Sequence, residues 1–426
     1  MTVALLFISF FLLMIIGVPI ALSLGIASLV TMIFATENSP TIIIQQAFTS
    51  LDSFPLMAIP LFILAGVLMS TGGISERLLN LANVLIGFVA GGLAMVTVLA
   101  SMFFAAISGS GPATVAAIGS FMIPSMKEKN YGSGFAAAIT ASAGSIGVLI
   151  PPSIPFVMYG VVGTVSIGSM FLAGIIPGLI LGLALMVISY ITAKKKGIEG
   201  SGITPTFKDV LKALNEAKFA LLVPVIILGG IYAGLFSPTE SAAVASVYAL
   251  FIGVFVYKEL TWKSVYQSFS SAALTNAATV IIIGFSVSFA YLMTRERIPS
   301  IVADFIISLS ENPLVVILII NIFLLIVGMF IDTISAIVIL TPILLPVVTN
   351  IGLDPIHFGV ILVMNLAIGF VTPPLGVNLF VASNVGKVSF EKITKGMIPI
   401  LVVMLIALAI VTYFPPLSTW IPSLRD

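Results

Sequence analysis

The chain has 426 residues, of which 60% are hydrophobic and 8% are charged, and its mean hydropathy is +1.26. Soluble domains carry about 25% charged residues, so this composition excludes a soluble protein. The net charge of +1 and the lack of a basic tract interleaved with aromatic residues give no reason to expect a nucleic-acid partner. The chain has no cysteine and one histidine, His357, which excludes disulfides, thiolate zinc sites, cysteine nucleophiles and histidine clusters.

Long uncharged runs indicate many membrane-spanning helices. Such runs cover residues 53–75, 78–126 and 130–193. A span needs about 20 apolar residues, so each longer run must hold several spans or re-entrant pieces. The first segment, 3–34, lacks the positively charged start of a signal peptide and is too long for a signal peptide's apolar part, so we expect a retained span. The sequence therefore predicts an all-α polytopic membrane protein.

The predicted elements form two similar halves joined by a charged linker. The first half, 1–193, should hold spans near 3–34, 40–72 and 78–100, a helical hairpin at 101–126, a broken helix at 131–168 and a span at 171–193. The linker, 194–218, should lie in the cytoplasm, with an amphipathic surface helix from Asp209 to Lys218. The second half, 219–426, should hold spans near 219–236, 240–257, 264–294 and 297–327, a hairpin at 328–349, a broken helix at 355–386 and a span at 396–414.

An internal duplication links the two halves. Adding 222 to Gly147, Pro151 and Pro152 gives Gly369, Pro373 and Pro374, and the same shift carries Pro124 to Pro346. Chance rarely keeps a glycine and three prolines in register, so we infer a structural repeat. Breaks in apolar helices are tolerated only where the freed backbone lines a protein cavity. Two breaks at matching places in two halves indicate the binding site of a transporter.

The lysines predict that the two repeats are inverted. They gather at 127–129, 194–218, 258–263 and 387–395. If each hairpin returns to the side from which it entered, all four groups lie on one side, which the positive-inside rule makes cytoplasmic. The first hairpin then opens to the cytoplasm and the second opens to the outside.

Small polar residues around the first break form one predicted half of the site. Ser108, Ser110 and Thr114 would contact substrate. Exposed carbonyls and hydroxyls can bind a hard cation, while helix N-termini can face an anion. We therefore predict a first sodium site formed by Ser110, Gly144, Ser145, Gly147 and Pro151. Close helix packing by small residues is the alternative.

The second break repeats this pattern with one carboxylate. A second sodium site is predicted from Gly328, Asp332, Thr333, Gly369 and Thr372. Asp332 lies in a long uncharged stretch, where ionisable residues are usually functional, so it could hold sodium or accept hydrogen bonds from substrate. Alternatively, Asp332 only caps a helix at a tip that reaches water.

Two further residues are predicted to bind substrate. Arg295 could pair with a substrate carboxylate, although most arginines at the end of a span are interfacial anchors. Asn378 follows the second break, where the second half-helix would meet a ligand. Glu240, in contrast, fits a capping box with Ser237 and is expected to stabilise a helix start.

At these residues the chain resembles the large membrane subunit of the tripartite ATP-independent periplasmic (TRAP) transporters. Four motifs carry the resemblance: Ser108-Gly-Ser-Gly-Pro-Ala-Thr114, Pro151-Pro-Ser153, Phe236-Ser-Pro-Thr-Glu-Ser-Ala-Ala-Val244 and Thr372-Pro-Pro-Leu-Gly-Val-Asn378. In the third motif, serines at 237 and 241 replace the threonine and alanine expected in the family, and helix capping tolerates both changes.

The resemblance implies a fixed scaffold and a mobile transport domain that work as an elevator in the bacterial inner membrane. It also implies sodium (Na+) coupling, a small four-helix membrane subunit and a periplasmic substrate-binding protein. Family substrates are organic acids, including C4-dicarboxylates and acidic sugars, and the chain most resembles the sialic-acid branch.

Other function classes compete with this expectation. A stand-alone divalent-anion/sodium symporter of similar architecture would need no delivery protein. An intramembrane aspartyl enzyme would need a second carboxylate facing Asp332, and the uncharged runs provide none. An ATP-driven pump is excluded for this chain because it lacks a phosphate-binding G-x-x-x-x-G-K-[ST] loop.

Overall fold

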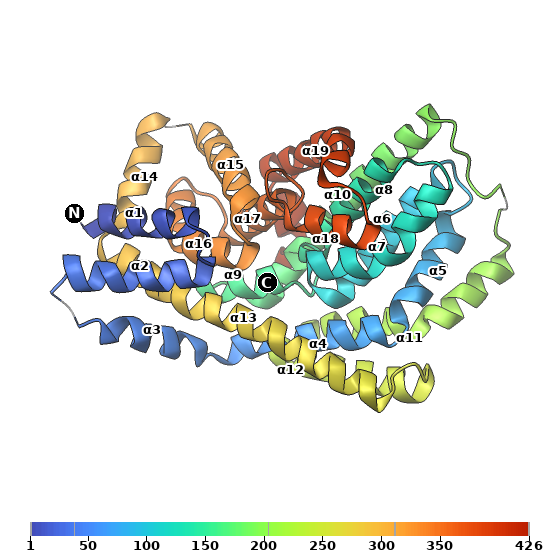
Figure 1. Ribbon diagram of the computed structural model, residues 1–426, viewed down its shortest axis with the longest axis horizontal. Coiled ribbons are helices and arrows are strands. Elements are labelled where there is room, and N and C mark those ends of the chain that lie inside the picture. Colours follow the sequence, from blue (N-terminus) through green and yellow to red (C-terminus); the bar gives the residue numbers. More distant parts are fainter. Residues whose placement is uncertain (1, 38, 203, 311, 425–426) are drawn as a thin grey trace.

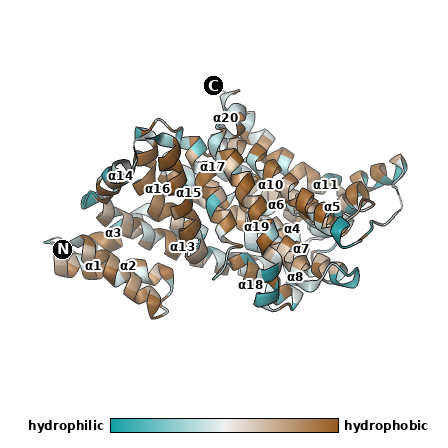
Figure 2. Cartoon of the chain, turned by 90° about the horizontal axis from the view of Figure 1, so that it is seen from above, coloured by the Kyte–Doolittle hydropathy of each residue, from teal (hydrophilic) through white to brown (hydrophobic). Residues whose placement is uncertain are grey.

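The computed structural model describes residues 2–37, 39–202, 204–310 and 312–424 and is helical with no strand in those ranges. Eight helices in this part of the chain are long and apolar enough to cross a membrane. Hydrophobic residues cover most of the helices, and hydrophilic residues gather near helix ends and turns (Figure 2). The predicted all-α polytopic membrane fold is confirmed.

The first half of the chain contains ten α-helices in the described ranges, with two short 3-10 turns between them. Its elements are α1 (Thr2–Ile15), α2 (Ile20–Ala35), α3 (Thr41–Leu51), η1 (Phe54–Met57), α4 (Ala58–Thr71), α5 (Ile74–Ile86), α6 (Gly92–Ser108), α7 (Gly111–Glu128), α8 (Ser133–Ser145), η2 (Ile146–Val148), α9 (Ile154–Val162) and α10 (Ile167–Lys195).

The second half has a similar order after the linker (Figure 1). Its elements are α11 (Phe207–Tyr232), α12 (Pro238–Phe251) with a π-helical turn η3 (Ile252–Val256), α13 (Trp262–Arg295), α14 (Ile298–Leu309), α15 (Pro313–Phe330), α16 (Thr333–Asn350), α17 (Pro355–Gly369), α18 (Val377–Gly386), α19 (Phe390–Tyr413) and α20 (Pro416–Ser423). In each half a hairpin precedes a broken helix and a long apolar helix.

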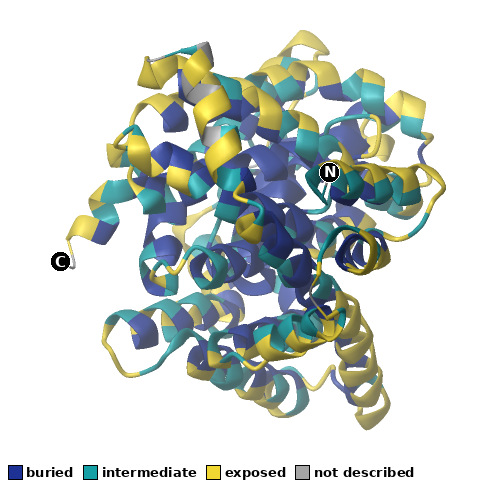
Figure 3. Cartoon of the chain, turned by 90° about the vertical axis from the view of Figure 1, so that its left-hand side faces the viewer, coloured by how far each residue is buried: buried dark blue, intermediate teal, exposed yellow. Residues whose placement is uncertain are grey.

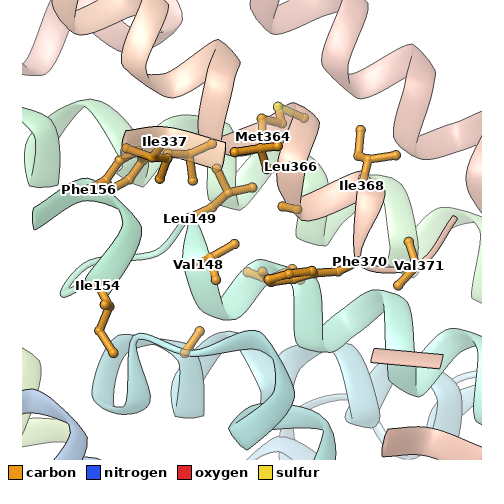
Figure 4. Close-up of a cluster of buried hydrophobic side chains, with 14 of the residues drawn as sticks. Val148, Leu149, Ile154, Phe156, Ile337, Met364, Leu366, Ile368, Phe370 and Val371 are labelled. Carbon is orange, nitrogen blue, oxygen red and sulfur yellow. The ribbon is translucent and has the colours of Figure 1, made fainter. Parts of the chain in front are cut away.

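Both helices break at the double prolines, as predicted. The first break separates η2 from α9 around Pro151 and Pro152, and the second separates α17 from α18 around Pro373 and Pro374. Both Pro–Pro bonds are cis. Apolar side chains next to the breaks, including Val148 and Leu149 of the first and Ile368 and Phe370 of the second, are buried in one hydrophobic cluster (Figure 4).

The predicted hairpin boundaries are wrong. The first hairpin is α6 and α7, residues 92–128 rather than 101–126, and the second is α15 and α16, residues 313–350 rather than 328–349. The predicted ranges miss residues 92–100 of the first arm in one hairpin and residues 313–327 of the first arm in the other. The arms are uniformly apolar, so composition alone does not separate an arm from the preceding span.

Several predicted spans are also divided in the structure. The span 3–34 is two helices, interrupted between Gly17, which has φ +86°, and Pro19. The span 40–72 is α3, η1 and α4, and the span 297–327 is α14 and most of α15. The range 78–100 contains the end of the amphipathic α5 and the start of α6. Glycine or proline interrupts most of these segments. Proline lacks the backbone N–H that a helix needs, and glycine allows φ angles outside the helical range.

The predicted surface helix of the linker does not end at Lys218. It continues into the next span as α11, which begins at Thr206 with a capping box to Asp209. A second capping box confirms the prediction at Ser237 and Glu240, where the Ser237 N–H donates to the Glu240 carboxylate at 2.7 Å.

Each broken helix packs against both hairpins. In the first half α8 lies on α7, and in the second half α17 lies on α15 and α16. Contacts also cross between the halves, since α18 packs on α7 and α9 packs on α16. Figure 3 shows buried residues concentrated in this central part of the molecule, with exposed residues on the outer helices. The two tips and the two breaks therefore belong to one packed centre.

Candidate functional site

The first hairpin tip is held against the first break by backbone contacts. Gly109 ends α6 with φ +60°, and its carbonyl accepts a hydrogen bond from the Ile154 N–H at 3.3 Å. A Cβ atom at Gly109 would lie 2.6 Å from the Pro152 carbonyl oxygen, so only glycine fits this approach. The tip and the break are thus fixed relative to each other.

Three hydroxyl residues at this tip have different roles. Ser108 Oγ and Thr114 Oγ1 are 3.0 Å apart and buried, and Thr114 Oγ1 lies 2.8 Å from the Ser110 carbonyl, to which it donates. Ser110 is half-buried and precedes α7 at the N-cap position, yet its side chain makes no capping hydrogen bond. The Ser110 hydroxyl is therefore not needed to start the helix.

Asn378 connects the second broken helix to the first. Its Nδ2 donates to the Ala141 carbonyl at 3.1 Å and to Ser145 Oγ at 3.2 Å. The residue is fully buried, and its Oδ1 has no hydrogen-bond partner among the described residues. A buried amide oxygen without a partner is costly, which points to a ligand or water at this place.

Oxygens gather around Gly111, next to Asn378. A Cβ atom at Gly111 would lie 3.3 Å from both Asn378 Oδ1 and the Gly144 carbonyl oxygen. The Ser110 carbonyl oxygen lies 2.7 Å from the Cβ position of Gly147. The structure thus brings together Ser110, Gly144, Ser145 and Gly147 of the predicted first sodium site. Pro151 is buried in the break, and no measured contact joins it to these oxygens.

This oxygen cluster fits a hard monovalent cation. Carbonyl, hydroxyl and amide oxygens at broken helices are the ligands that transporters use for sodium, and the orphaned Asn378 Oδ1 supplies an unfilled acceptor. Asn378, which the sequence predicts to bind substrate, lies among these oxygens, and its contact with substrate stays a prediction.

The second tip is closed by a carboxylate. Asp332 Oδ1 accepts hydrogen bonds from the N–H groups of Ile334 and Ser335, both at 3.0 Å, and Oδ2 accepts from Ser335 Oγ at 2.5 Å. Asp332 is half-buried and caps α16. Asp332 therefore caps α16, and its binding of sodium or substrate stays a prediction.

The remaining residues of the second predicted sodium site surround a backbone contact. A Cβ atom at Gly369 would lie 2.4 Å from the Gly328 carbonyl oxygen, so α15 and α17 touch through glycine. Thr333 Oγ1 is buried without a partner in the described part of the chain, whereas Thr372 Oγ1 donates to the Ile368 carbonyl at 2.8 Å. Thr333 directly follows Asp332 in the chain, so its unpartnered hydroxyl lies at the second tip.

Both tips border one cavity of about 590 Å³. Ser108 and Ser110 line it from the first tip, Ile334 lines it from the second, and Ile154 lines it after the first break. The two tips therefore lie close together. Arg295 does not line this cavity; it is exposed at the end of α13 and forms no ion pair with any residue that the structure describes.

The sequence did not indicate the other hydroxyl residues of the cavity. Five of them, from α4, α5 and α13, also line it and are called here the hydroxyl wall: Ser70, Thr71, Ser75, Thr275 and Thr279. Ser70, Thr71 and Ser75 surround a glycine pair that resembles an ordinary turn, and the two threonines lie in a long apolar helix. Their α-helical spacing of four is the one signal that could have placed Thr275 and Thr279 on one face.

Two broken helices that meet two hairpins beside a cavity are the architecture of a membrane transporter. A family model described as "Tripartite ATP-independent periplasmic transporter, DctM component" matches residues 7–417. The chain belongs to this family and is a transport subunit, not an enzyme.

Similar proteins cover most of the chain. The isethionate TRAP transporter permease protein DctMQ of Oleidesulfovibrio alaskensis is 52% identical over 406 residues, which are 95% of this chain and 64% of that protein. This chain thus spans somewhat less than two thirds of that relative. The sialic acid TRAP transporter large permease protein SiaM of Vibrio cholerae is 41% identical, and the match covers 96% of this chain and 95% of SiaM. The C4-dicarboxylate TRAP transporter large permease protein DctM of the same organism is also 41% identical, with 100% and 98% covered.

Solved structures support the fold. The YdaH transporter of Alcanivorax borkumensis matches with a TM-score of 0.62 at 14% sequence identity, covering 91% of this chain and 90% of that one. MtrF of Neisseria gonorrhoeae matches with a TM-score of 0.60 at 14% identity, covering 87% and 83%. At this identity the likeness concerns architecture alone.

Proposed function

We propose that this chain is the large permease subunit of a sodium-coupled importer of an organic acid in the bacterial inner membrane. The observation that carries the proposal is that both tips border one cavity, while Asn378 Oδ1 and Thr333 Oγ1 have no hydrogen-bond partner among the described residues. Relatives named for isethionate, sialic acid and C4-dicarboxylates favour an organic acid as cargo.

Sodium would be bound by the two oxygen clusters. The first consists of oxygens from Ser110, Gly144, Ser145 and Asn378, and the second lies at Asp332 and Thr333. A bound cation would attract the acid group of the substrate into the cavity between them. The start of α7, which follows Ser110 with Pro112 in its first turn, would face the same acid group with its N–H groups.

The two hairpins and the two broken helices would move as one body in an elevator mechanism. The hydrogen bonds from Asn378 to Ala141 and Ser145 support this view, because they join the second half to the first inside the packed centre. The cavity between this centre and α4, α5 and α13 would carry the substrate across the moving interface.

Partners follow from the family. Its description names a tripartite periplasmic transporter of which this is one component. We propose a periplasmic binding protein that delivers the acid and a small four-helix membrane subunit that completes the complex, with lipid around the exposed apolar helices.

Uptake by the purified membrane complex in vesicles tests these points. We expect uptake of isethionate, N-acetylneuraminate or succinate only with an inward sodium gradient and a loaded binding protein. Equal uptake with potassium would contradict sodium coupling. Uptake of free acid without any binding protein would favour the stand-alone divalent-anion symporter instead.

A further inference from the structure

The cavity beside the two tips is lined by neutral residues alone. Among its described lining residues none is ionisable, and every polar one carries a hydroxyl. Ser108, Ser110 and Ser120 face it from the first hairpin, and the hydroxyl wall faces it from α4, α5 and α13. A ligand here would therefore meet hydroxyls from the first hairpin and from the hydroxyl wall, together with the first turns of α7 and α5.

The residues of the hydroxyl wall differ in what they can still bind. Thr275 Oγ1 donates to the Ser271 carbonyl at 3.0 Å, and Thr279 Oγ1 donates to the Thr275 carbonyl at 3.1 Å. Because each of these hydroxyls already donates its proton to a backbone carbonyl, it can only accept a hydrogen bond from a ligand. Both can accept a hydrogen bond from a ligand hydroxyl but cannot stabilise a second acid group.

Ser75 differs from these two threonines. It is 4% exposed, and its hydroxyl has no hydrogen-bond partner among the residues that the structure describes. It lies in the first turn of α5, and it lines the cavity. A buried hydroxyl without a partner costs free energy unless a ligand or water satisfies it.

A second negative charge would be unfavourable at this wall. It would lie in a partly dehydrated space without a cationic side chain, where an unpaired charge is costly. Two carboxylates lie next to lining residues in the chain and would repel it: Asp332 precedes Ile334 by two positions, and Glu76 follows Ser75. A hydroxyl or amide in the same place would instead gain hydrogen bonds.

We propose that the hydroxyl wall is a subsite for the neutral, hydroxyl-bearing tail of a singly charged organic acid, with Ser75 as its specificity-determining residue. The acid group lies at the first tip, and the tail donates to Thr275 or Thr279 and bonds to Ser75. This inference rests on the proposed function and adds the substrate class: hydroxylated monoanions are accepted, and dicarboxylates are rejected.

The first test needs no variant. Binding of isethionate, N-acetylneuraminate and succinate to the purified membrane complex is measured in sodium buffer, without the binding protein, which would add its own selectivity. We expect one of the two singly charged acids to bind at least about tenfold more tightly than succinate. Succinate binding as tightly as, or more tightly than, both would overturn the inference and leave the proposed function intact. Binding of none of the three, together with no sodium-driven uptake, would overturn the proposed function itself.

The second test isolates the hydroxyl contact. The singly charged acid that binds best is compared with its analogue lacking a hydroxyl, for example ethanesulfonate for isethionate. A net hydrogen bond contributes roughly 0.5–1.5 kcal/mol, so we expect a preference of about three- to tenfold for the hydroxylated acid. Ser75→Ala should reduce this preference to below about twofold.

Ser286→Ala is the matched control. Ser286 is also a fully buried serine whose hydroxyl lacks a partner in the described ranges, but it does not line the cavity. We expect it to keep the wild-type preference. If Ser75→Ala does not fold, Ser75→Cys, which removes the strong donor at similar size, is measured in its place. An unchanged preference in the Ser75 variant, or an equal loss in Ser286→Ala, would overturn the role of Ser75.

Discussion

The tip at Ser110 and the tip at Asp332 occupy corresponding places in the two halves, but different groups close them. At the first tip the N-cap side chain makes no capping bond, and backbone contacts to Pro152 and Ile154 hold the turn. At the second tip three hydrogen bonds to one carboxylate start the helix. The duplication thus preserved the geometry of the break while leaving the second half a charge that the first half lacks.

In the first half the residue proposed to bind ligand, Ser110, is not needed to start the helix. In the second half Asp332 both starts the helix and is proposed to bind ligand. Ser110 can lose its hydroxyl without exposing a helix start, whereas Asp332 cannot lose its carboxylate without a structural cost. Variants at the two tips should therefore differ in thermal stability even where they lose transport alike. The following expectations run from the largest effect on stability to the smallest.

Gly369→Ala should have the largest effect. The new methyl group would lie 2.4 Å from both the backbone carbon and the oxygen of Gly328, and a backbone cannot move aside as a flexible side chain can. Overpacking of this kind typically costs about 1–3 kcal/mol or more, so we expect little folded protein and no uptake. Gly229→Ala is the control, since nothing lies within 4 Å of its Cβ position. Size-exclusion profiles and thermal unfolding in detergent measure both; equal profiles would refute the contact.

Asn378→Ala should be next. It leaves the Ala141 carbonyl and Ser145 Oγ without their donor in a fully buried place, which costs about 1–3 kcal/mol. We expect a clearly lower unfolding temperature together with loss of sodium-dependent uptake. The exposed Asn350 at the end of α16 gives the control Asn350→Ala, which should unfold like the wild type.

Asp332→Ala should cost about 1 kcal/mol, as removal of an N-cap does. Asp332→Asn should unfold near the wild-type temperature, because asparagine caps as well as aspartate, while it removes the charge. If the carboxylate binds sodium, both variants lose sodium-dependent uptake. Full uptake by Asp332→Asn would show that Asp332 is a cap and no more.

Ser110→Ala should leave the unfolding temperature unchanged, since the Ser110 hydroxyl caps nothing. We expect uptake to be lost because this hydroxyl faces the cavity beside the oxygen cluster. The pair Ser110→Ala and Asp332→Ala thus tests the contrast between the tips directly. A similar fall in unfolding temperature in both variants would contradict the proposed difference between the two tips.

Arg295→Ala should have the smallest effect. The side chain is exposed, lines no part of the cavity and forms no ion pair within the described ranges. We expect both the unfolding temperature and the half-saturating substrate concentration to match the wild type, as for an interfacial anchor. A large rise in the half-saturating concentration would restore its predicted role at the substrate carboxylate.

The sequence predicted the breaks better than the helices around them. Pro151 and Pro373 each begin a proline pair inside an apolar run, and such a pair breaks a helix. The shift of 222 residues relates the two breaks to each other. The first arms of the hairpins could not be separated from the preceding spans because the same apolar composition serves both. Periodicity does not say whether an apolar helix faces lipid or protein.

The site was predictable within each half but not between halves. The oxygens near Gly144 and Gly147 follow the motif, whereas the Asn378 bond to Ser145 depends on α18 packing against α7 and α8. Ser75 gave no signal at all, since a serine beside Gly72, Gly73 and Glu76 resembles a solvated turn. Such residues acquire a role only when the fold places the turn against a cavity.

The contact between Gly328 and Gly369 limits where selection and engineering can act on cargo choice. Two main chains that touch leave no space for a new side chain at either glycine, so neither position can be varied to change the cargo. The hydroxyl residues of α4, α5 and α13 border the cavity and do have adjoining space. A library of variants aimed at a new cargo should therefore vary residues of α4, α5 and α13 and keep Gly328 and Gly369 unchanged.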